Sequence, residues 1–418
     1  MTRANGPHRL GRAAVAGAAL ASLALTGCGV LPRADARPAP VVIAADLELS
    51  GPGAAVGTVL HRALELRVEQ VNSQGLLPGR ELRLVVRDNG SSHAAAVDNL
   101  ADLAADEQVS LIVTGGCARC VAEAAPALEE AGVPTISLAF GEIVAEPVTE
   151  RRYVFQVAPR ARDTAELLVA EAVRLGLRRI ALVTADSGGY SREAARELAA
   201  AAEAVGLDLV ASEHVGAEAD AEQLRQIAAR LSQWQPEPIG SPLGLPGQAG
   251  PERLDAVVLW APTETASQLA LALRQAGWRG QLLLDASAAG SLFLTNDDPQ
   301  RDALAGARLV FTETLVIDQA IAGSPAKAAR QGWWRDYVAR YGGYDAHSSF
   351  AADAIGLLVA AVSRTGSTDR DQLRDTIEAT SLDGLSGPIR FTPDSHSGLQ
   401  PMALTVLVAA GDRWRLAN

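Results

Sequence analysis

From Val41 onward, the sequence alternates between short apolar runs and longer segments whose apolar residues have helical spacing. Residues 41–49 (VVIAADLEL) are largely apolar, which is typical of a parallel strand buried on both faces. Residues 55–75 follow at helical spacing and end at a glycine, the usual C-terminal stop. The alternation continues to residue 140 in the order β-α-β-α-β-α-β. This order predicts an open parallel sheet with helices on both faces.

The same pattern restarts at residues 153–159 (YVFQVAP) and runs to about residue 286. It predicts a second doubly wound unit, so the fold class is α/β with two parallel-sheet lobes. We expect the later strand at 307–315 (ARLVFTETL) and three helical stretches, 325–341, 348–364 and 371–380, to return to the first unit. Two β segments, 387–394 and 402–417, are expected to close the chain.

These patterns divide the folded body into lobes. We expect residues 41–157 and 287–382 to form the first lobe and residues 158–286 to form the second, with residues 383–418 closing on the second. The stretch 235–253 carries prolines at 236, 238, 242, 246 and 251, so it cannot hold a helix or a central strand. We interpret it as an inserted surface loop.

The N-terminus has the features of an export signal. Three arginines precede a short apolar run at residues 13–25, which falls short of the roughly 20 residues that span a membrane. The run ends in LTGC at 25–28, which resembles the bacterial lipobox. That resemblance implies that residues 1–27 are removed, that Cys28 is lipidated, and that residues 28–40 form a flexible tether. The alternative is an ordinary secretory signal with a chance cysteine.

The composition limits the function. The 418 residues carry a net charge of −12, with no basic stripe, which argues against a nucleic-acid partner. The sequence contains no G-x-S-x-G, H-E-x-x-H or P-loop motif, so we do not expect an enzyme. No cofactor and no resident metal are predicted.

Several motifs, taken in order, resemble the type I periplasmic binding proteins of the Leu/Ile/Val-binding class. They are Ser50-Gly51-Pro52 after the first strand, the turn glycines near Asn72, the segment VPTISLAF at 133–140, and the strand-loop-Tyr element around Tyr190. The later segments 344–362 and 385–399 also match, so the resemblance covers nearly all of residues 41–417. It implies two α/β lobes joined by three crossovers that close on a small ligand.

The resemblance also implies where the ligand would bind. In this family, loops at the carboxyl ends of the strands hold the ligand, and helix N-termini favour its carboxylate. The corresponding positions in this chain are Ser50, Gly51, Cys117, Ala118, Arg119, Ala139, Phe140, Tyr190, Trp260, Asp285 and Ser287. Ala118 and Arg119 replace the hydroxyl residues that are usual in the family, which is a departure from its amino-acid site. Asp285 lies close to the family's acidic residue for the ligand ammonium group, with an offset towards Ser287.

Three of these aromatic and charged positions have alternative interpretations. Phe140 is either a pocket wall or a lobe-packing side chain. Trp260, at the end of an apolar strand, either lines the pocket or packs in the core. Arg119 either offers its charge to an anionic ligand or points into solvent.

Cys117 and Cys120 have C-x-x-C spacing at the start of a predicted helix. We expect a local disulfide that stiffens the ligand loop, since the chain is expected outside the cytoplasm. A redox centre and a metal site with His93 are the alternatives.

The sequence therefore predicts a solute-binding lipoprotein of an ABC importer. It would be a monomer, anchored to the outer face of the cytoplasmic membrane through Cys28. Its partners would be a small, amino-acid-like ligand and a membrane permease. The alternatives are a ligand sensor for a membrane receptor, without transport, and a redox or metal lipoprotein that uses Cys117 and Cys120.

Overall fold

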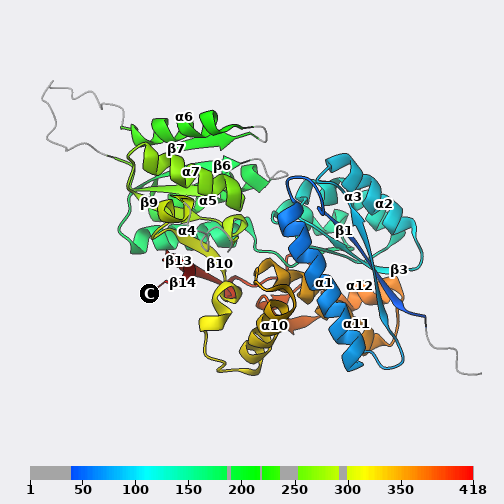
Figure 1. Cartoon of the computed structure of the whole chain (residues 1–418). Coiled ribbons are helices and arrows are strands. Elements are labelled where there is room, and N and C mark those ends of the chain that lie inside the picture. The colour runs from blue at the N-terminus through cyan, green and yellow to red at the C-terminus, as the bar shows by residue number, and fades with distance from the viewer. Residues whose placement is uncertain (1–38, 186–189, 217–218, 236–252, 291–298, 418) are drawn as a thin grey trace, which may run out of the picture. The chain divides into compact units, whose positions relative to one another are not determined.

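The computed structural model describes residues 39–185, 190–216, 219–235, 253–290 and 299–417. The predicted signal, Cys28, nearly all of the tether, and most of the proline-rich loop lie outside the described residues. Residues 39–417 belong to one compact unit, which contains two large sheets in separate lobes and a small two-stranded sheet (Figure 1).

The first lobe is built on a five-stranded parallel sheet with the order β2-β1-β3-β4-β5. Its strands are β1 (Val41–Leu47), β2 (Leu82–Asp88), β3 (Val109–Thr114), β4 (Thr135–Ser137) and β5 (Val154–Gln156). The helices that connect them are α1 (Ala54–Gln74), α2 (His93–Ala105) and α3 (Ala118–Ala131). Every residue of β1 and β3 is buried, which explains the continuous apolar runs.

Three later helices also belong to the first lobe: α10 (Pro325–Tyr341), α11 (His347–Thr365) and α12 (Arg370–Glu378). Helix α11 packs against α1 and α12. Tyr341 of α10 donates a hydrogen bond to the carbonyl of Arg62 in α1 at 3.0 Å.

The second lobe contains a seven-stranded sheet with the order β14-β13-β10-β9-β8-β6-β7. Its strands are β6 (Arg179–Ala185), β7 (Asp208–Val215), β8 (Ala256–Trp260), β9 (Gln281–Leu284), β10 (Arg308–Thr312), β13 (Leu404–Ala410) and β14 (Arg413–Leu416). The helices are α4 (Ala161–Arg174), α5 (Tyr190–Val205), α6 (Ala221–Ser232), α7 (Thr263–Gln275) and α9 (Pro299–Ala303). The strands from β10 to β7 are parallel, and β13 and β14 add an antiparallel edge. The predicted fold class is confirmed.

Two assignments of strands to lobes were wrong. Strand β10, expected in the first lobe, pairs with β9 and β13 in the second sheet, so the chain returns to the first lobe only after Thr312. Strand β12 (Pro388–Arg390), expected to close on the second lobe, pairs with β11 (Ser381–Asp383) in a separate two-stranded sheet. A buried apolar run predicts a strand, but it does not show which sheet completes its hydrogen bonds.

The chain passes between the lobes three times, at residues 157–160, at 313–319 and between β12 and β13. The first and third crossovers run together, because Gln156 N–H donates to the His396 carbonyl and Gly398 N–H donates to the Gln156 carbonyl, both at 2.8 Å. The buried His396 ring stacks on Phe155 with centroids 4.3 Å apart. These contacts tie the two crossovers to each other.

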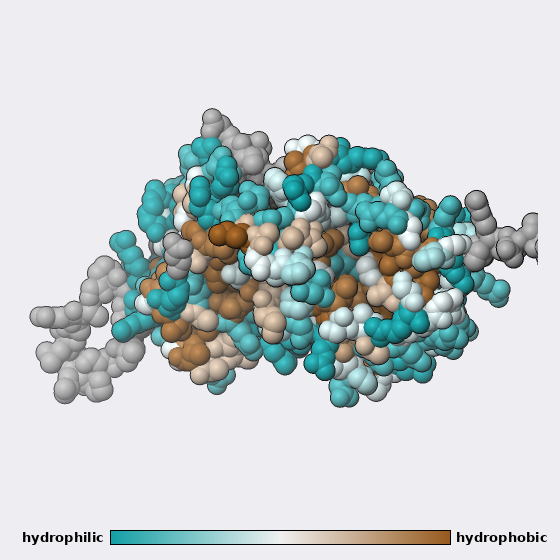
Figure 2. Space-filling model, turned by 90° about the horizontal axis from the view of Figure 1, so that it is seen from below, coloured by the Kyte–Doolittle hydropathy of each residue, from teal (hydrophilic) through white to brown (hydrophobic). Residues whose placement is uncertain are grey.

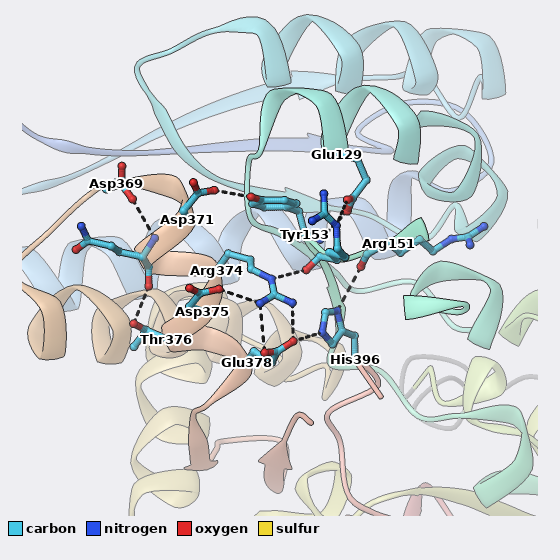
Figure 3. A network of polar contacts seen from close by, with 12 residues as sticks. Glu129, Arg151, Tyr153, Asp369, Asp371, Arg374, Asp375, Thr376, Glu378 and His396 are labelled. Atoms are coloured by element: carbon cyan, nitrogen blue, oxygen red, sulfur yellow. Dashed lines mark hydrogen bonds and ion pairs between the residues drawn. The ribbon is translucent and has the colours of Figure 1, made fainter. Parts of the chain in front are cut away.

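A polar network fastens the third crossover to the first lobe (Figure 3). His396 Nε2 lies 3.0 Å from the Glu378 carboxylate at the end of α12, and its Nδ1 lies 3.0 Å from the Val154 carbonyl. Arg374 of α12 donates to the Arg152 carbonyl at 2.9 Å and pairs with Glu378. Helix α12 therefore fixes the position of both crossovers on the first lobe.

The described surface mixes hydrophobic and hydrophilic areas. On the face seen in Figure 2, hydrophobic areas are interrupted by hydrophilic ones. Ile321 and Met402 are the most exposed large hydrophobic side chains among the described residues. Within the same residues, no helix is both long and apolar enough to cross a membrane.

Candidate functional site

The loop after β4 carries two predicted ligand residues, Ala139 and Phe140. The buried side-chain amide of Gln156, at the end of β5, donates to the carbonyls of Ala139 and Gly141 at 2.8 and 2.9 Å. Its own carbonyl oxygen accepts from the Ser397 hydroxyl at 2.9 Å. Gly141 has a φ of 112°, which a residue with a side chain rarely adopts. Gln156 and Gly141 together shape the loop that presents Phe140.

This loop touches the start of α5 in the second lobe. The Phe140 and Tyr190 rings lie 5.9 Å apart between centroids. The carboxylate of Glu193 accepts a hydrogen bond from the Glu142 N–H at 2.7 Å. Phe140 also lies 6.0 Å from the ring of His347, at the start of α11. The structure thus brings two predicted residues from different lobes, Phe140 and Tyr190, into contact.

On the second lobe, Tyr190 and Trp260 are predicted ligand residues that lie together. Their rings are 5.7 Å apart, and each residue is only 1% exposed. The Trp260 indole N–H lies near the Tyr190 hydroxyl. The two groups do not meet the geometry of a hydrogen bond. Burial raises the pKa of Tyr190, the nearby charges of Asp285 and Glu193 raise it further, and the Trp260 N–H partly opposes them. Among the described residues, the Tyr190 hydroxyl and the Trp260 indole N–H are thus buried without a hydrogen-bond partner.

Asp285 and Ser287, also predicted as ligand residues, stabilise the loops of the second lobe. The Asp285 carboxylate accepts from the Ala261 N–H at 3.1 Å and from the N–H and hydroxyl of Ser287, both at 2.9 Å. Burial raises its pKa to about 7. Asp285 joins the loops after β8 and β9, and its carboxylate is already occupied by donors of the chain itself.

Ser50 and Gly51 connect two loops of the first lobe. The Ser50 hydroxyl donates to the Asp88 carboxylate at 2.7 Å. Gly51 has a φ of 78° and packs against the Gly90 carbonyl, where a Cβ atom would come within 2.7 Å. Both residues are exposed. Among the described residues, the Ser50 hydroxyl and the close packing of Gly51 both involve the loop after β2.

Cys117 and Cys120 are paired in a disulfide at the start of α3, with Cα atoms 5.3 Å apart. Cys117 is the N-cap residue of the helix, and its sulfur accepts from the Cys120 N–H at 3.2 Å. His93 Nδ1 lies 3.4 Å from the Cys120 sulfur, and its Nε2 lies 2.7 Å from Glu123. With both sulfur atoms in the disulfide, His93 is left without the two thiolates that a metal site would need.

The neighbours of Cys117 differ in exposure. Ala118 is buried, and its Cβ lies 3.6 Å from the place where a Cβ on Gly141 would stand. Arg119 is exposed at the surface of the first turn of α3. Ala118 therefore belongs to the contact around Gly141, and Arg119 does not.

Five further residues of this region were not predicted from the sequence: Glu48, Glu142, Gln156, Glu193 and His347. Each of them lies at a strand end or in the first turn of a helix, which is where a doubly wound sheet presents its binding residues. Their position at the ends of strands and helices was the only signal in the sequence. It could not identify them, because acidic residues are common at such positions on protein surfaces.

Comparisons with known proteins agree with this geometry. The family model described as periplasmic binding protein matches residues 40–412. The chain belongs to this family. A Leu/Ile/Val-binding protein homolog 7 of Brucella suis biovar 1 (strain 1330) is 30% identical over 149 residues. The aligned part spans 35% of this periplasmic binding protein and 36% of the relative, about a third of each chain.

Solved structures with the same fold cover almost the whole binding protein. An extracellular ligand-binding receptor from Rhodopseudomonas palustris HaA2 matches with a TM-score of 0.75 and 21% identity, covering 91% of this chain and 100% of that one. The branched-chain amino acid transporter substrate binding protein LivJ from Streptococcus pneumoniae, solved with isoleucine, has a TM-score of 0.72 and 18% identity, over 90% and 99% of the two chains. These matches confirm the fold predicted from the sequence, and the family model confirms the family.

Proposed function

We propose that this binding protein captures a small solute between its two lobes and delivers it to the permease of an ABC importer. The observation that carries the proposal is the meeting of Phe140 from the first lobe with Tyr190 from the second, next to the buried Trp260. Buried aromatic walls with a few polar groups are typical of small-molecule sites. The relatives named for Leu, Ile and Val, and the neighbour solved with isoleucine, support a solute of amino-acid-like size.

A thermal-shift screen tests the proposal. The panel would contain branched-chain and aromatic amino acids, their amides and amines, short-chain carboxylates and ureas. A ligand that binds only the folded state stabilises it by roughly 2.7 kcal/mol at a hundred times its Kd. We expect at least one stabilising compound, with one site per chain by calorimetry. A flat response across the panel would count against solute capture and favour a sensor of another compound.

We also propose that the protein acts outside the cytoplasm as a lipid-anchored monomer. The support is the lipobox-like LTGC at residues 25–28 and the family's periplasmic description. Expression in a bacterial host with labelled palmitate should place label on the wild type and none on Cys28→Ser. The variant should then appear in the soluble fraction. Equal labelling of the two proteins would rule out lipidation at Cys28.

A further inference from the structure

Glu48, one residue after β1, reaches across to the loop that follows β3. The Gly116 N–H donates to both of its carboxylate oxygens, at 3.1 Å each. The Cys117 N–H also favours the charged form of this carboxyl group, although burial raises its pKa overall. Gly116 and Cys117 immediately precede α3, so the Glu48 carboxylate sits at the N-terminus of that helix. Unpaired N–H groups and the helix dipole make such a position favourable for an anion.

The surroundings of Glu48 are fitted to it. A Cβ atom on Gly57 would collide with the Glu48 carbonyl oxygen, and one on Gly53 would come within 2.8 Å of the Glu48 Cβ. A Cβ atom on Gly115 would overlap the carboxylate itself. Gly57 within α1, Gly53 at its N-cap and Gly115 after β3 therefore leave room for the backbone and side chain of Glu48. This packing distinguishes a built niche from a surface carboxylate that happens to lie near a helix.

Carboxyl groups without an ion-pair partner gather around the site. Apart from Glu48, three buried carboxylates lie near the Phe140–Tyr190 contact: Glu142, Glu193 and Asp285. In the described part of the chain, no arginine, lysine or histidine forms an ion pair with any of the four. Arg162 and Arg196 lie nearby and pair with Glu197, while their charges, and that of Arg160, also act at longer range on Glu142 or Glu193. A cationic solute is favoured at such a site, and an anionic one is repelled.

We propose that Glu48 is the chain's own occupant of the anion position at the N-terminus of α3. The solute is then an amine-bearing cation without a free carboxylate, rather than a free α-amino acid. The part of the proposal that concerns the solute rests on the proposed function, whereas the placement of Glu48 does not. Glu48 selects the solute by filling a place that a carboxylate of the solute would otherwise take.

Acetate binding tests the placement of Glu48. The protein would be compared as wild type, Glu48→Ala, which empties the niche, and Glu48→Gln, which keeps it filled without charge. Sodium chloride at equal ionic strength is the control. We expect acetate to raise the melting temperature of Glu48→Ala alone, with an affinity at least about tenfold above that of the wild type. If Glu48→Ala folds poorly, recovery of folded protein on refolding in acetate is the same readout. If acetate changes neither the melting temperature nor the refolding yield of Glu48→Ala, the proposed placement of Glu48 is wrong.

Three matched compounds test the solute class: leucine, leucinamide and 3-methylbutylamine. The wild type should bind the amide or the amine at least about tenfold more tightly than leucine, and Glu48→Ala should gain leucine binding while Glu48→Gln does not. Leucine binding to the wild type as tightly as leucinamide would overturn the solute class. If acetate binds to Glu48→Ala but the wild type binds none of the three, the placement of Glu48 stands and the capture of a solute of this size fails.

Discussion

The carboxylate of Glu193, in the first turn of α5, accepts a hydrogen bond from the backbone N–H of Glu142 at 2.7 Å. The bond joins the second lobe to the loop after β4 of the first lobe, next to Phe140 and Tyr190. Burial raises the pKa of Glu193 to about 7. Because this carboxylate titrates near pH 7, the contact between the lobes should depend on pH.

Replacing Glu193 with glutamine should flatten the dependence of stability on pH. A carboxyl group whose pKa is higher in the folded chain binds its proton more tightly when folded. The free energy of unfolding should therefore fall as the pH rises from about 4.5 to about 7, by up to about 3 kcal/mol from this group. Burial also raises the pKa of Asp46 and Asp353 to about 6, so the wild type should show a larger total fall.

Urea titrations at several pH values would measure this effect. Glu203→Gln, an exposed position on the same helix, is the matched control and should leave the wild-type profile unchanged. Equal profiles for Glu193→Gln and the wild type would show that Glu193 does not titrate differently in the folded chain.

Gly141→Ala should destabilise the protein more than Gly277→Ala does. Both glycines have positive φ, 112° and 85°, so each substitution adds backbone strain of about 1 kcal/mol or more. A Cβ on Gly141 would also stand 3.3 Å from Glu193 and 3.6 Å from the Tyr190 ring, whereas no atom of the described residues lies within 4 Å of one on Gly277. Comparing the melting temperatures of the two variants separates the effect of crowding between the lobes from that of backbone strain. Equal losses would mean that the lobe contact at Gly141 is loose in solution.

Tyr190→Phe should leave the stability of the ligand-free protein unchanged or raise it by about 1 kcal/mol, because the buried hydroxyl has no hydrogen-bond partner among the described residues. Tyr341→Phe, which removes a hydroxyl bonded to Arg62 at 3.0 Å, should instead lose about 1 kcal/mol. Chemical denaturation would compare the two. A loss at Tyr190 as large as that at Tyr341 would show that the Tyr190 hydroxyl already has a partner in solution.

Cys117 and Cys120 should resist alkylation until a reductant is added. Reduction should lower the free energy of unfolding by about 2 kcal/mol, the chain-entropy value for such a short loop. Peptide mass spectrometry and unfolding curves with and without reductant would measure both effects. Two thiols that are alkylated without a reductant would instead support the redox or metal alternative with His93.

Strand and helix order could be predicted from the sequence because buried parallel strands are continuous apolar runs and α/β helices are amphipathic. The sheet to which each strand belongs could not be predicted. Strand β10 is apolar on both sides whichever lobe it joins, and its place was decided by β9 before it and β13 nearly a hundred residues later.

The candidate site could be predicted only in part. Trp260 ends β8, Tyr190 begins α5 and Phe140 lies in the loop after β4, so topology alone brings them to the edges of the sheets. Glu193 and Gln156 could not be recognised, because their hydrogen-bond partners are backbone groups whose positions depend on how the loops fold. The same applies to Glu48, whose partner is the Gly116 N–H of a different strand loop.

Calorimetric titration of the best solute from the screen, against wild type, Phe140→Ala and Tyr190→Ala, tests the central claim most directly. The two substitutions lie on different lobes, and Tyr341→Ala, on α10, is the control. If the solute is held between the lobes, each of the first two should weaken binding at least about tenfold, and the control should not change it. Saturable binding that neither substitution weakens, or no saturable binding by any compound of the panel, would contradict the account.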